Sequence, residues 1–237
     1  MAFIGFDKVY KIYPSGVKAL QNISFSIEEG EFVFLVGPTG AGKTTLMKLI
    51  NREELPTSGD IWFDDIRINH LDDGYLPFLR RNLGIIFQDL KLIPSRTVYE
   101  NLIFPLQIMG IKKNTISKIS TRILAMLEME NRKHHLVEWL SGGEKQKLCL
   151  GRALIHQPQL VLADEPTGNL DHYSAYEMVE TLYLYCREEK ASVIVSTHNI
   201  GLLKSFSGRI LQLDQGRLVT DHYNYSKVRS ETGLEYR

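Results

Sequence analysis

A glycine-rich motif directly after an apolar run constrains the fold of this chain most strongly. Residues 32–36 read Phe-Val-Phe-Leu-Val, and the motif that follows is Gly37-Pro38-Thr39-Gly40-Ala41-Gly42-Lys43-Thr44-Thr45. After the motif, apolar residues recur at a spacing typical of a helix: Leu46, Met47, Leu49 and Ile50. This order predicts a strand, a phosphate loop and a helix, and therefore a site for a nucleoside triphosphate.

The chemistry of a triphosphate explains these residue types. Glycines at positions 37, 40 and 42 let the backbone curl, so that successive N–H groups point into one concavity. The helix that begins there adds its free N–H groups and the positive end of its dipole. In this motif the lysine, here Lys43, meets the β- and γ-phosphates, and the hydroxyl of Thr44 can bind Mg²⁺. The alternative is an ordinary glycine turn with a surface lysine.

The composition limits the class of protein. A chain of 237 residues is long enough for one large α/β unit, and its 28 basic and 28 acidic residues give no excess charge that favours nucleic acid as a partner. The two cysteines, Cys149 and Cys186, have no paired metal-ligand spacing, and a chain of this size without a cysteine framework is typical of a reducing cytosol. No apolar run approaches the roughly 20 residues that cross a bilayer, so we expect no direct membrane insertion.

Strand-like and helical segments alternate along the chain. Strands are predicted at 3–9, 20–27, 31–36 and 61–68. Residues 98–157 are mainly helical, and two buried-type strands, 160–163 and 193–196, enclose another helix. This alternation predicts an α/β fold with a parallel sheet. We expect a single domain over 1–220, with a helical subdomain at about 89–157 inserted in the core, and a short polar tail at 221–237.

Two acidic residues, Asp164 and Glu165, end the apolar run at 160–163. In phosphate-loop enzymes an acid at this place holds Mg²⁺, and a following carboxylate can orient and deprotonate the attacking water. Because Mg²⁺ prefers hard oxygen ligands, Asp164 and Thr44 are predicted metal ligands. The alternative is a strand that simply ends in a solvated acidic turn.

A second glycine motif, Leu140-Ser141-Gly142-Gly143-Glu144, stands just before a helical segment. Ser141 can cap that helix, and the glycines expose its first N–H groups, which makes a second anion site. Taken alone, the motif would be merely a helix cap. Together with the phosphate loop, it gives one chain two phosphate sites of different design.

The order of these motifs resembles that of the ATP-binding cassette ATPases, from about residue 3 to 220. The motifs are the phosphate loop, Gln88 after Ile85-Ile86-Phe87, LSGGE, LVLADEP, Thr167-Gly168-Asn169-Leu170-Asp171, and His198 after a β-rich run. The resemblance implies a P-loop core with a mainly parallel sheet, an antiparallel β subdomain and an inserted helical subdomain, with ATP and Mg²⁺ as ligands. In this family two cassettes sandwich two ATP molecules head to tail. The resemblance thus implies a homodimer in the ATP-bound state, in which Ser141, Gly142 and Gly143 act in trans.

The resemblance also implies a role for five single residues. Tyr13 matches the aromatic residue that stacks on adenine, with a half-buried strand tyrosine as the alternative. Gln88 matches the glutamine that senses Mg²⁺ and the attacking water and links to the membrane partner, so it is expected as a third metal ligand beside Asp164 and Thr44. Glu165 is the expected general base, and His198 the histidine on the γ-phosphate, although a lone histidine is more often structural. Asp171 is expected at the dimer interface.

Residues 79–101, the most family-specific segment, closely resemble the FtsE subfamily, the cell-division cassettes that work with the membrane protein FtsX. The resemblance implies an integral membrane partner of FtsX type, a position on the cytoplasmic side of the bacterial inner membrane, and control of peptidoglycan hydrolases. Leu90, Leu92 and Ile93 either contact that partner or fill the local core.

Other functions remain open from the sequence. Cassettes of lipoprotein-release and macrolide-export systems share the motif at 163–171, and departures such as Thr39 and Thr44 in place of common serines bear on affinity. An ATP-gated scaffold that recruits division proteins is an alternative of another class. The balanced charge argues against a cassette acting on DNA or ribosomes. The charged run Asn51-Arg52-Glu53-Glu54 has no role in any of these hypotheses.

Overall fold

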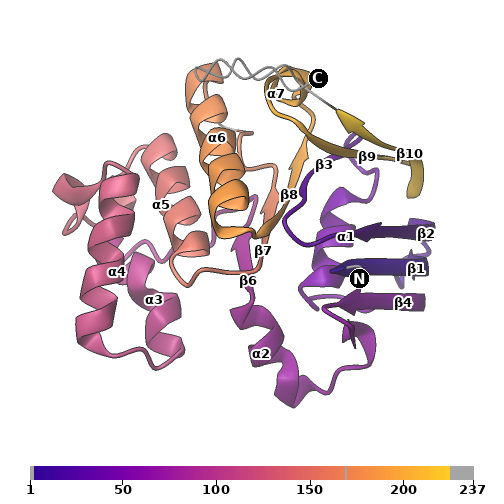
Figure 1. Ribbon diagram of the computed structural model, residues 1–237, viewed down its shortest axis with the longest axis horizontal. Helices are drawn as coiled ribbons and strands as arrows, with labels where there is room; N and C mark the ends of the chain where they lie inside the picture. Colours follow the sequence, from indigo (N-terminus) through magenta and orange to yellow (C-terminus); the bar gives the residue numbers. More distant parts are fainter. Residues whose placement is uncertain (1–2, 169, 225–237) are drawn as a thin grey trace.

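A six-stranded sheet forms the centre of the fold in the computed structural model, which describes residues 3–168 and 170–224 (Figure 1). Its strands, in spatial order, are β10 (Arg217–Asn224), β9 (Gly208–Asp214), β3 (Phe32–Val36), β8 (Ser192–Thr197), β7 (Leu160–Asp164) and β6 (Leu83–Ile86). The five strands from β9 to β6 are parallel, and β10 pairs antiparallel with β9 at one edge. The carboxyl ends of β3, β8 and β7 therefore meet at one edge of the sheet.

A second, antiparallel sheet contains four strands. In spatial order they are β2 (Lys18–Ile27), β1 (Ile4–Ile12), β4 (Ser58–Phe63) and β5 (Ile66–Arg67). The prediction of a single strand over 61–68 is wrong, because Asp64 and Asp65 adopt φ values of 47° and 61° and separate β4 from β5. Positive φ at two successive residues is the conformation of a tight hairpin turn. Ile68 already belongs to a 3₁₀ turn, Ile68–His70.

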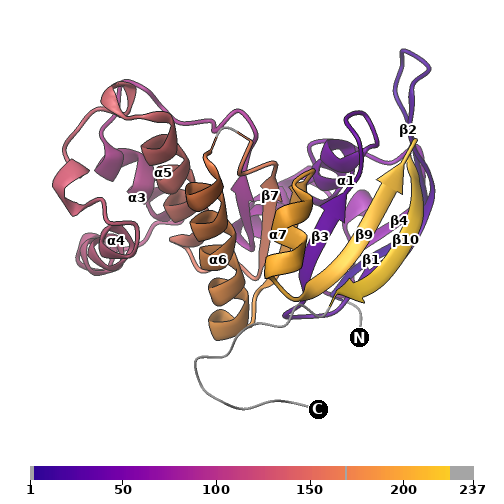
Figure 2. The same cartoon turned by 90° about the horizontal axis from the view of Figure 1, so that it is seen from above.

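Helices surround the six-stranded sheet. They are α1 (Lys43–Ile50), α2 (Leu76–Arg81), α3 (Val98–Ile108), α4 (Lys113–Met126), α5 (Gly142–Leu154), α6 (His172–Glu189) and α7 (Ile200–Ser205). In both views α3, α4 and α5 form a group at one side of the molecule, and the four-stranded sheet lies at the other (Figures 1 and 2). This group lies within the range 89–157 of the expected helical insertion.

The parallel strands are buried on both faces, which explains their continuous apolar runs. Side chains of a strand alternate between its faces, and β3 shows this directly. Phe32 and Phe34 belong to a core that includes residues of α3 to α6, whereas Val33 and Leu35 belong to a core that includes α1 and the four-stranded sheet. The central sheet thus separates two hydrophobic cores.

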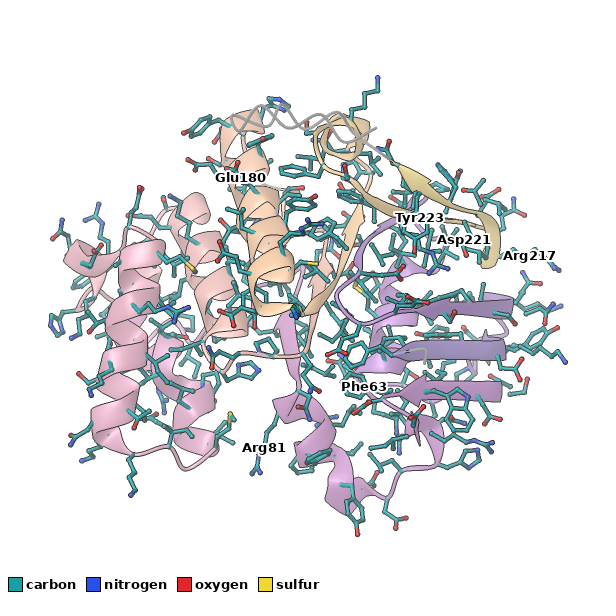
Figure 3. The ribbon with its side chains drawn as sticks, viewed as in Figure 1. Phe63, Arg81, Glu180, Arg217, Asp221 and Tyr223 are labelled. Atoms are coloured by element: carbon teal, nitrogen blue, oxygen red, sulfur yellow. The ribbon has the colours of Figure 1, made fainter. Side chains whose placement is uncertain are left out.

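The last strand is anchored by polar contacts near its end. Arg209 on β9 donates hydrogen bonds of 2.7 and 2.8 Å to the carboxylate of Asp221, and the hydroxyl of Tyr223 donates to Glu31. Figure 3 labels Asp221 and Tyr223 on β10. The prediction of a polar tail from residue 221 is therefore wrong for residues 221–224, which continue β10. The rest of that segment, 225–237, lies outside the described residues.

Candidate nucleotide-binding and catalytic site

The phosphate loop joins β3 to α1, and two of its glycines are required by close packing. A Cβ atom on Gly37, which has φ 149°, would lie 2.2 Å from the carbonyl oxygen of Leu213. A Cβ on Gly42, which has φ 107° and precedes the first residue of α1, would lie 2.6 Å from the carbonyl oxygen of Ala19. Only glycine fits at these positions, because both the dihedral angle and the space exclude a side chain.

Two predicted site residues, Lys43 and His198, lie beside the carboxylate of a third, Glu165, at the carboxyl edge of the parallel sheet. The Lys43 ammonium donates to the carbonyl oxygens of Gly37 and Pro38, at 2.8 and 3.2 Å. The Glu165 carboxylate lies 3.5 Å from that ammonium and 3.7 Å from Nδ1 of His198. Lys43 begins α1, Glu165 follows β7 and His198 follows β8, so the parallel arrangement of three neighbouring strands brings these side chains together.

The three side chains of this cluster differ in how far they are exposed to solvent. The side chain of Lys43 is 5% exposed and that of Glu165 is 22% exposed, whereas the side chain of His198 is 69% exposed. Glu165 also has φ 46°, a conformation that non-glycine residues rarely adopt. The carboxylate is therefore held by an unusual backbone turn between a buried cation and an accessible imidazole.

Ser196 fixes the two acidic residues, and sequence reasoning missed it. Its hydroxyl donates to Asp164 Oδ1 at 2.7 Å and accepts from the backbone N–H of Glu165 at 2.8 Å. Ser196 is fully buried on β8, where the parallel register pairs it with Asp164. The only sequence signal was a polar residue within the apolar run 193–196, and its partner depends on the strand register.

The three predicted metal ligands line one cavity of about 470 Å³, whose walls include Thr44, Gln88 and Asp164. They offer a hydroxyl, an amide and a carboxylate oxygen, and hard oxygen donors of this kind suit Mg²⁺. The residues present therefore fit a magnesium ion bound beside the phosphates.

The loop that follows Gln88 is held by helix α5. Arg152 donates hydrogen bonds of 2.6 Å to the carbonyl oxygens of both Leu90 and Lys91, which have φ values of 59° and 47°. Burial lowers the pKa of the Arg152 guanidinium. Leu90 and Leu92 pack against the core near the helices, so the alternative that these leucines fill the local core agrees with the structure. Gln88 itself is exposed.

Tyr13 lies one residue beyond the end of β1 and is half-buried. Its hydroxyl is 3.3 Å from the hydroxyl of Thr45 on α1, so the tyrosine borders the phosphate-loop helix. The remaining loop residues, Thr39, Gly40 and Ala41, lie between the two close-packed glycines.

The LSGGE motif begins α5 with a reciprocal cap. The Ser141 hydroxyl accepts from the backbone N–H of Glu144 at 3.3 Å, and the Glu144 carboxylate accepts from the backbone N–H of Ser141 at 2.8 Å. This backbone hydrogen bond, with Arg132 beside it, lowers the pKa of Glu144. Helices α1 and α5 lie on opposite sides of β7 in both views (Figures 1 and 2). The two predicted anion sites are therefore in separate parts of the chain.

Asp171 caps the next long helix. Its carboxylate accepts hydrogen bonds from the hydroxyl and backbone N–H of Ser174 and from the backbone N–H of Tyr173, and these bonds lower the pKa of Asp171. The neighbouring Leu170 approaches Gly143 of the LSGGE motif, and both line the same surface cavity. The structure thus places the Asp171 turn beside the LSGGE motif.

Comparisons with known proteins agree with this architecture. A family model described as "ABC transporter" matches residues 20–168, which is more than half of the chain. The cell division ATP-binding protein FtsE of Bacillus subtilis (strain 168) is 39% identical over 218 residues, which cover 92% of this chain and 95% of that protein. The protein of the same name from Escherichia coli (strain K12) is 40% identical over 215 residues, with 91% and 96% covered.

A solved structure agrees with the fold. It is the dimeric structure of a post-hydrolysis state of the ATP-binding cassette MJ0796, bound to ADP and Pi, which superposes with a TM-score of 0.86 at 34% identity and covers 93% of this chain and 98% of that one. Among the residues that the structure describes, no helix has both the length and the hydropathy of a membrane span. The predicted cassette fold is confirmed, and the chain belongs to the ABC transporter family as one of its ATPase subunits.

Proposed function

We propose that this chain is the ATP-hydrolysing subunit of an FtsE-type complex. It dimerises on ATP and drives a conformational change in an integral membrane partner of FtsX type, which regulates peptidoglycan hydrolysis during cell division. The observation that carries the ATPase part is that Lys43 and His198 both lie beside the carboxylate of Glu165. The cell-division part rests on the 39–40% identity to FtsE proteins over more than nine-tenths of the chain.

Each side chain has a distinct task in this proposal. The loop amides and Lys43 bind the phosphates, while Thr44, Asp164 and Gln88 would hold Mg²⁺, which neutralises phosphate charge when it is bound. Glu165 accepts the proton of the attacking water as general base, and His198 donates a hydrogen bond to the γ-phosphate. The contacts of Glu165 with Lys43 and His198 support this geometry, because they bring the base next to the groups that bind the terminal phosphate.

The glycines of the LSGGE motif support a shared site. Apart from chain neighbours and the backbone of the same helix, a Cβ on Gly142 would meet no heavy atom within 4 Å, and one on Gly143 would approach only Leu170, at 3.7 Å. Glycine in a helix costs roughly 0.5–1 kcal/mol relative to alanine. Since no contact within the described residues requires glycine here, close approach by a group from outside the chain explains it. We propose that this group is the ATP of a second copy, with Asp171 at the interface.

The loop after Gln88 is the proposed contact with the membrane partner. Leu90 and Leu92 pack on the core, so they are not available to a partner. The surface that this loop offers for docking consists of its exposed side chains, which include Gln88, Pro94 and Ser95. Docking there would hold the chain on the cytoplasmic side of the bacterial inner membrane, as a peripheral subunit. Because Arg152 ties this loop to the LSGGE helix, movement of one would reach the other.

Ser196→Ala should impair hydrolysis more than stability. The substitution removes the hydroxyl that orients both Asp164 and the Glu165 backbone. A hydrogen bond to a charged group contributes roughly 1.5–3 kcal/mol, so we expect the turnover number for ATP to fall by about 10- to 100-fold and the Mg²⁺ requirement to rise. Steady-state kinetics over a range of Mg²⁺ concentrations measure both.

Ser192→Ala is the matched control for this variant. Ser192 is equally buried on β8, but its hydroxyl bonds to the backbone of Gly30 and Glu28, at the other end of the strand. It should lower the melting temperature by a similar amount and leave the turnover number near that of the parent. Equal turnover in the two serine variants would contradict the role given to Ser196.

Purification of the tagged chain from detergent-solubilised membranes tests the partner. We expect mass spectrometry to find an FtsX-type membrane protein, and recovery of a lipoprotein-release permease instead would overturn the proposal. Ser95→Arg places a bulky cation on the exposed loop and should reduce the recovery. Thr220→Arg makes the same change on β10, at the opposite edge of the sheet from β6, and should leave the recovery unchanged.

A further inference from the structure

The charged segment after α1 contacts the end of β1. The side chain of Lys11 is only 11% exposed, and its ammonium donates to Glu54 Oε2 at 2.6 Å and to the carbonyl oxygen of Leu55 at 2.8 Å. Glu54 closes the run Asn51-Arg52-Glu53-Glu54, for which the sequence offered no role. This ion pair connects two segments that are 43 residues apart in the sequence.

The same ammonium lies over the ring of Tyr13, 4.9 Å from its centroid. A cation at this distance from an aromatic face is attracted by the ring. The Tyr13 hydroxyl meets Thr45 on α1 at 3.3 Å, so the ring is held at its face and at its tip. These two contacts therefore fix the position of the Tyr13 ring relative to helix α1.

The backbone around Lys11 is fixed as well. Thr57 donates its N–H to the carbonyl oxygen of Tyr10 at 2.7 Å, and its hydroxyl accepts from the N–H of Ile12 at 2.9 Å. These bonds join the segment after α1 to β1 on either side of Lys11. The lysine consequently has little freedom to leave the Tyr13 ring.

We propose that Lys11, held by Glu54, is a positioning residue for recognition of the base of ATP. It fixes the Tyr13 ring in the orientation in which the half-buried ring receives the planar base. A recognition surface that is ordered in advance binds more tightly, because less conformational entropy is lost on binding. The inference rests on the proposed function and on the role that the family resemblance implies for Tyr13, which is to stack on adenine.

A purely structural ion pair makes a different prediction. If Lys11 and Glu54 only stabilise the fold, their loss lowers the melting temperature and affects all phosphate ligands alike. If Lys11 positions Tyr13, its loss weakens binding only of ligands that carry a base. Inorganic tripolyphosphate has the phosphates without the base, so it separates the two roles.

The experiment measures the KM and turnover number for ATP, and the inhibition constant of tripolyphosphate against ATP hydrolysis. The variants are Lys11→Met, Tyr13→Leu, their combination, Lys11→Arg and Glu54→Gln. For Lys11→Met we expect the KM for ATP to rise by roughly three- to thirtyfold, the range that a cation–π contact supports. The turnover number and the tripolyphosphate constant should stay near the parental values, and Lys11→Arg should restore most of the affinity.

The double variant and the controls make the result specific. Because Lys11 acts through Tyr13, the combined substitution should raise the KM no further than Tyr13→Leu alone. Glu54→Gln should raise it in the same direction, whereas Lys8→Met, at an exposed lysine of the same strand, should not. Additive effects, or an equal loss for tripolyphosphate, would overturn the positioning role. If Tyr13→Leu itself leaves the KM unchanged, the stacking assignment fails and the inference fails with it.

Discussion

Glu165→Gln is expected to lower the turnover number for ATP by about 10²- to 10⁴-fold while ATP binding is retained. The amide keeps the size of the carboxylate but cannot accept a proton from water. In the parent, the Glu165 side chain is 22% exposed and lies 3.5 Å from the Lys43 ammonium, so the fold should survive the loss of this charge. Phosphate release measures turnover, and equilibrium binding of ATP measures affinity.

The same variant should accumulate an ATP-bound dimer. If closure of two copies requires ATP and opening requires its hydrolysis, a chain that binds without hydrolysing remains closed, and size-exclusion chromatography with Mg²⁺-ATP detects it. Glu188→Gln, at an exposed position on α6, serves as the control and should behave like the parent. Parental turnover by Glu165→Gln would show that the general base is another group. If the variant lost turnover and still replaced the parent fully in dividing cells, the ATP-gated scaffold would be favoured.

Two inactive variants, Lys43→Met and Gly142→Asp, should restore activity when they are mixed. Lys43→Met removes the buried ammonium of the phosphate loop but retains an unbranched side chain of similar length. Gly142→Asp adds a carboxylate at the start of α5, where its Cβ would meet nothing within 4 Å apart from its chain neighbours and the backbone of its own helix. An acid at a helix N-terminus is compatible with folding, yet it would repel the phosphates of the partner's ATP.

The expected recovery follows from the geometry of a shared site. A mixed dimer holds one intact pair, the phosphate loop of the Gly142→Asp chain facing the LSGGE motif of the Lys43→Met chain. With random pairing and independent sites, the mixture should reach about a quarter of the parental rate. Each variant alone, at the same total concentration, is the control and should stay inactive. Parental activity of Gly142→Asp alone would contradict the shared site.

Local patterns were sufficient for much of the architecture. The order of apolar run, glycine motif and helical spacing predicted β3, the phosphate loop and α1, because each depends on residues adjacent in the sequence. The apolar runs before Asp164 and His198 predicted β7 and β8 for the same reason. The carboxyl ends of these neighbouring parallel strands meet at one edge of the sheet, which is where the structure brings Lys43, Glu165 and His198 together.

The predictions that were wrong concern the ends of elements. The hairpin between β4 and β5 turns at Asp64 and Asp65 without a glycine, so the pattern over 61–68 resembled one continuous strand. The polar residues 221–224 looked like a tail, yet Asp221 is held by Arg209, and its strand pairs with β9. In both places tertiary pairing outweighed local composition.

Short motifs in the sequence predict which residues bind phosphate and which acids act on water, because motif chemistry depends on residues that are close together along the chain. The distant groups that support these residues become visible only in the folded structure. Strand register brings Ser196 to Asp164, and the packing of β1 against the segment after α1 brings Lys11 and Glu54 to Tyr13. These contacts join positions that no periodicity connects, so they exist only when the chain is folded.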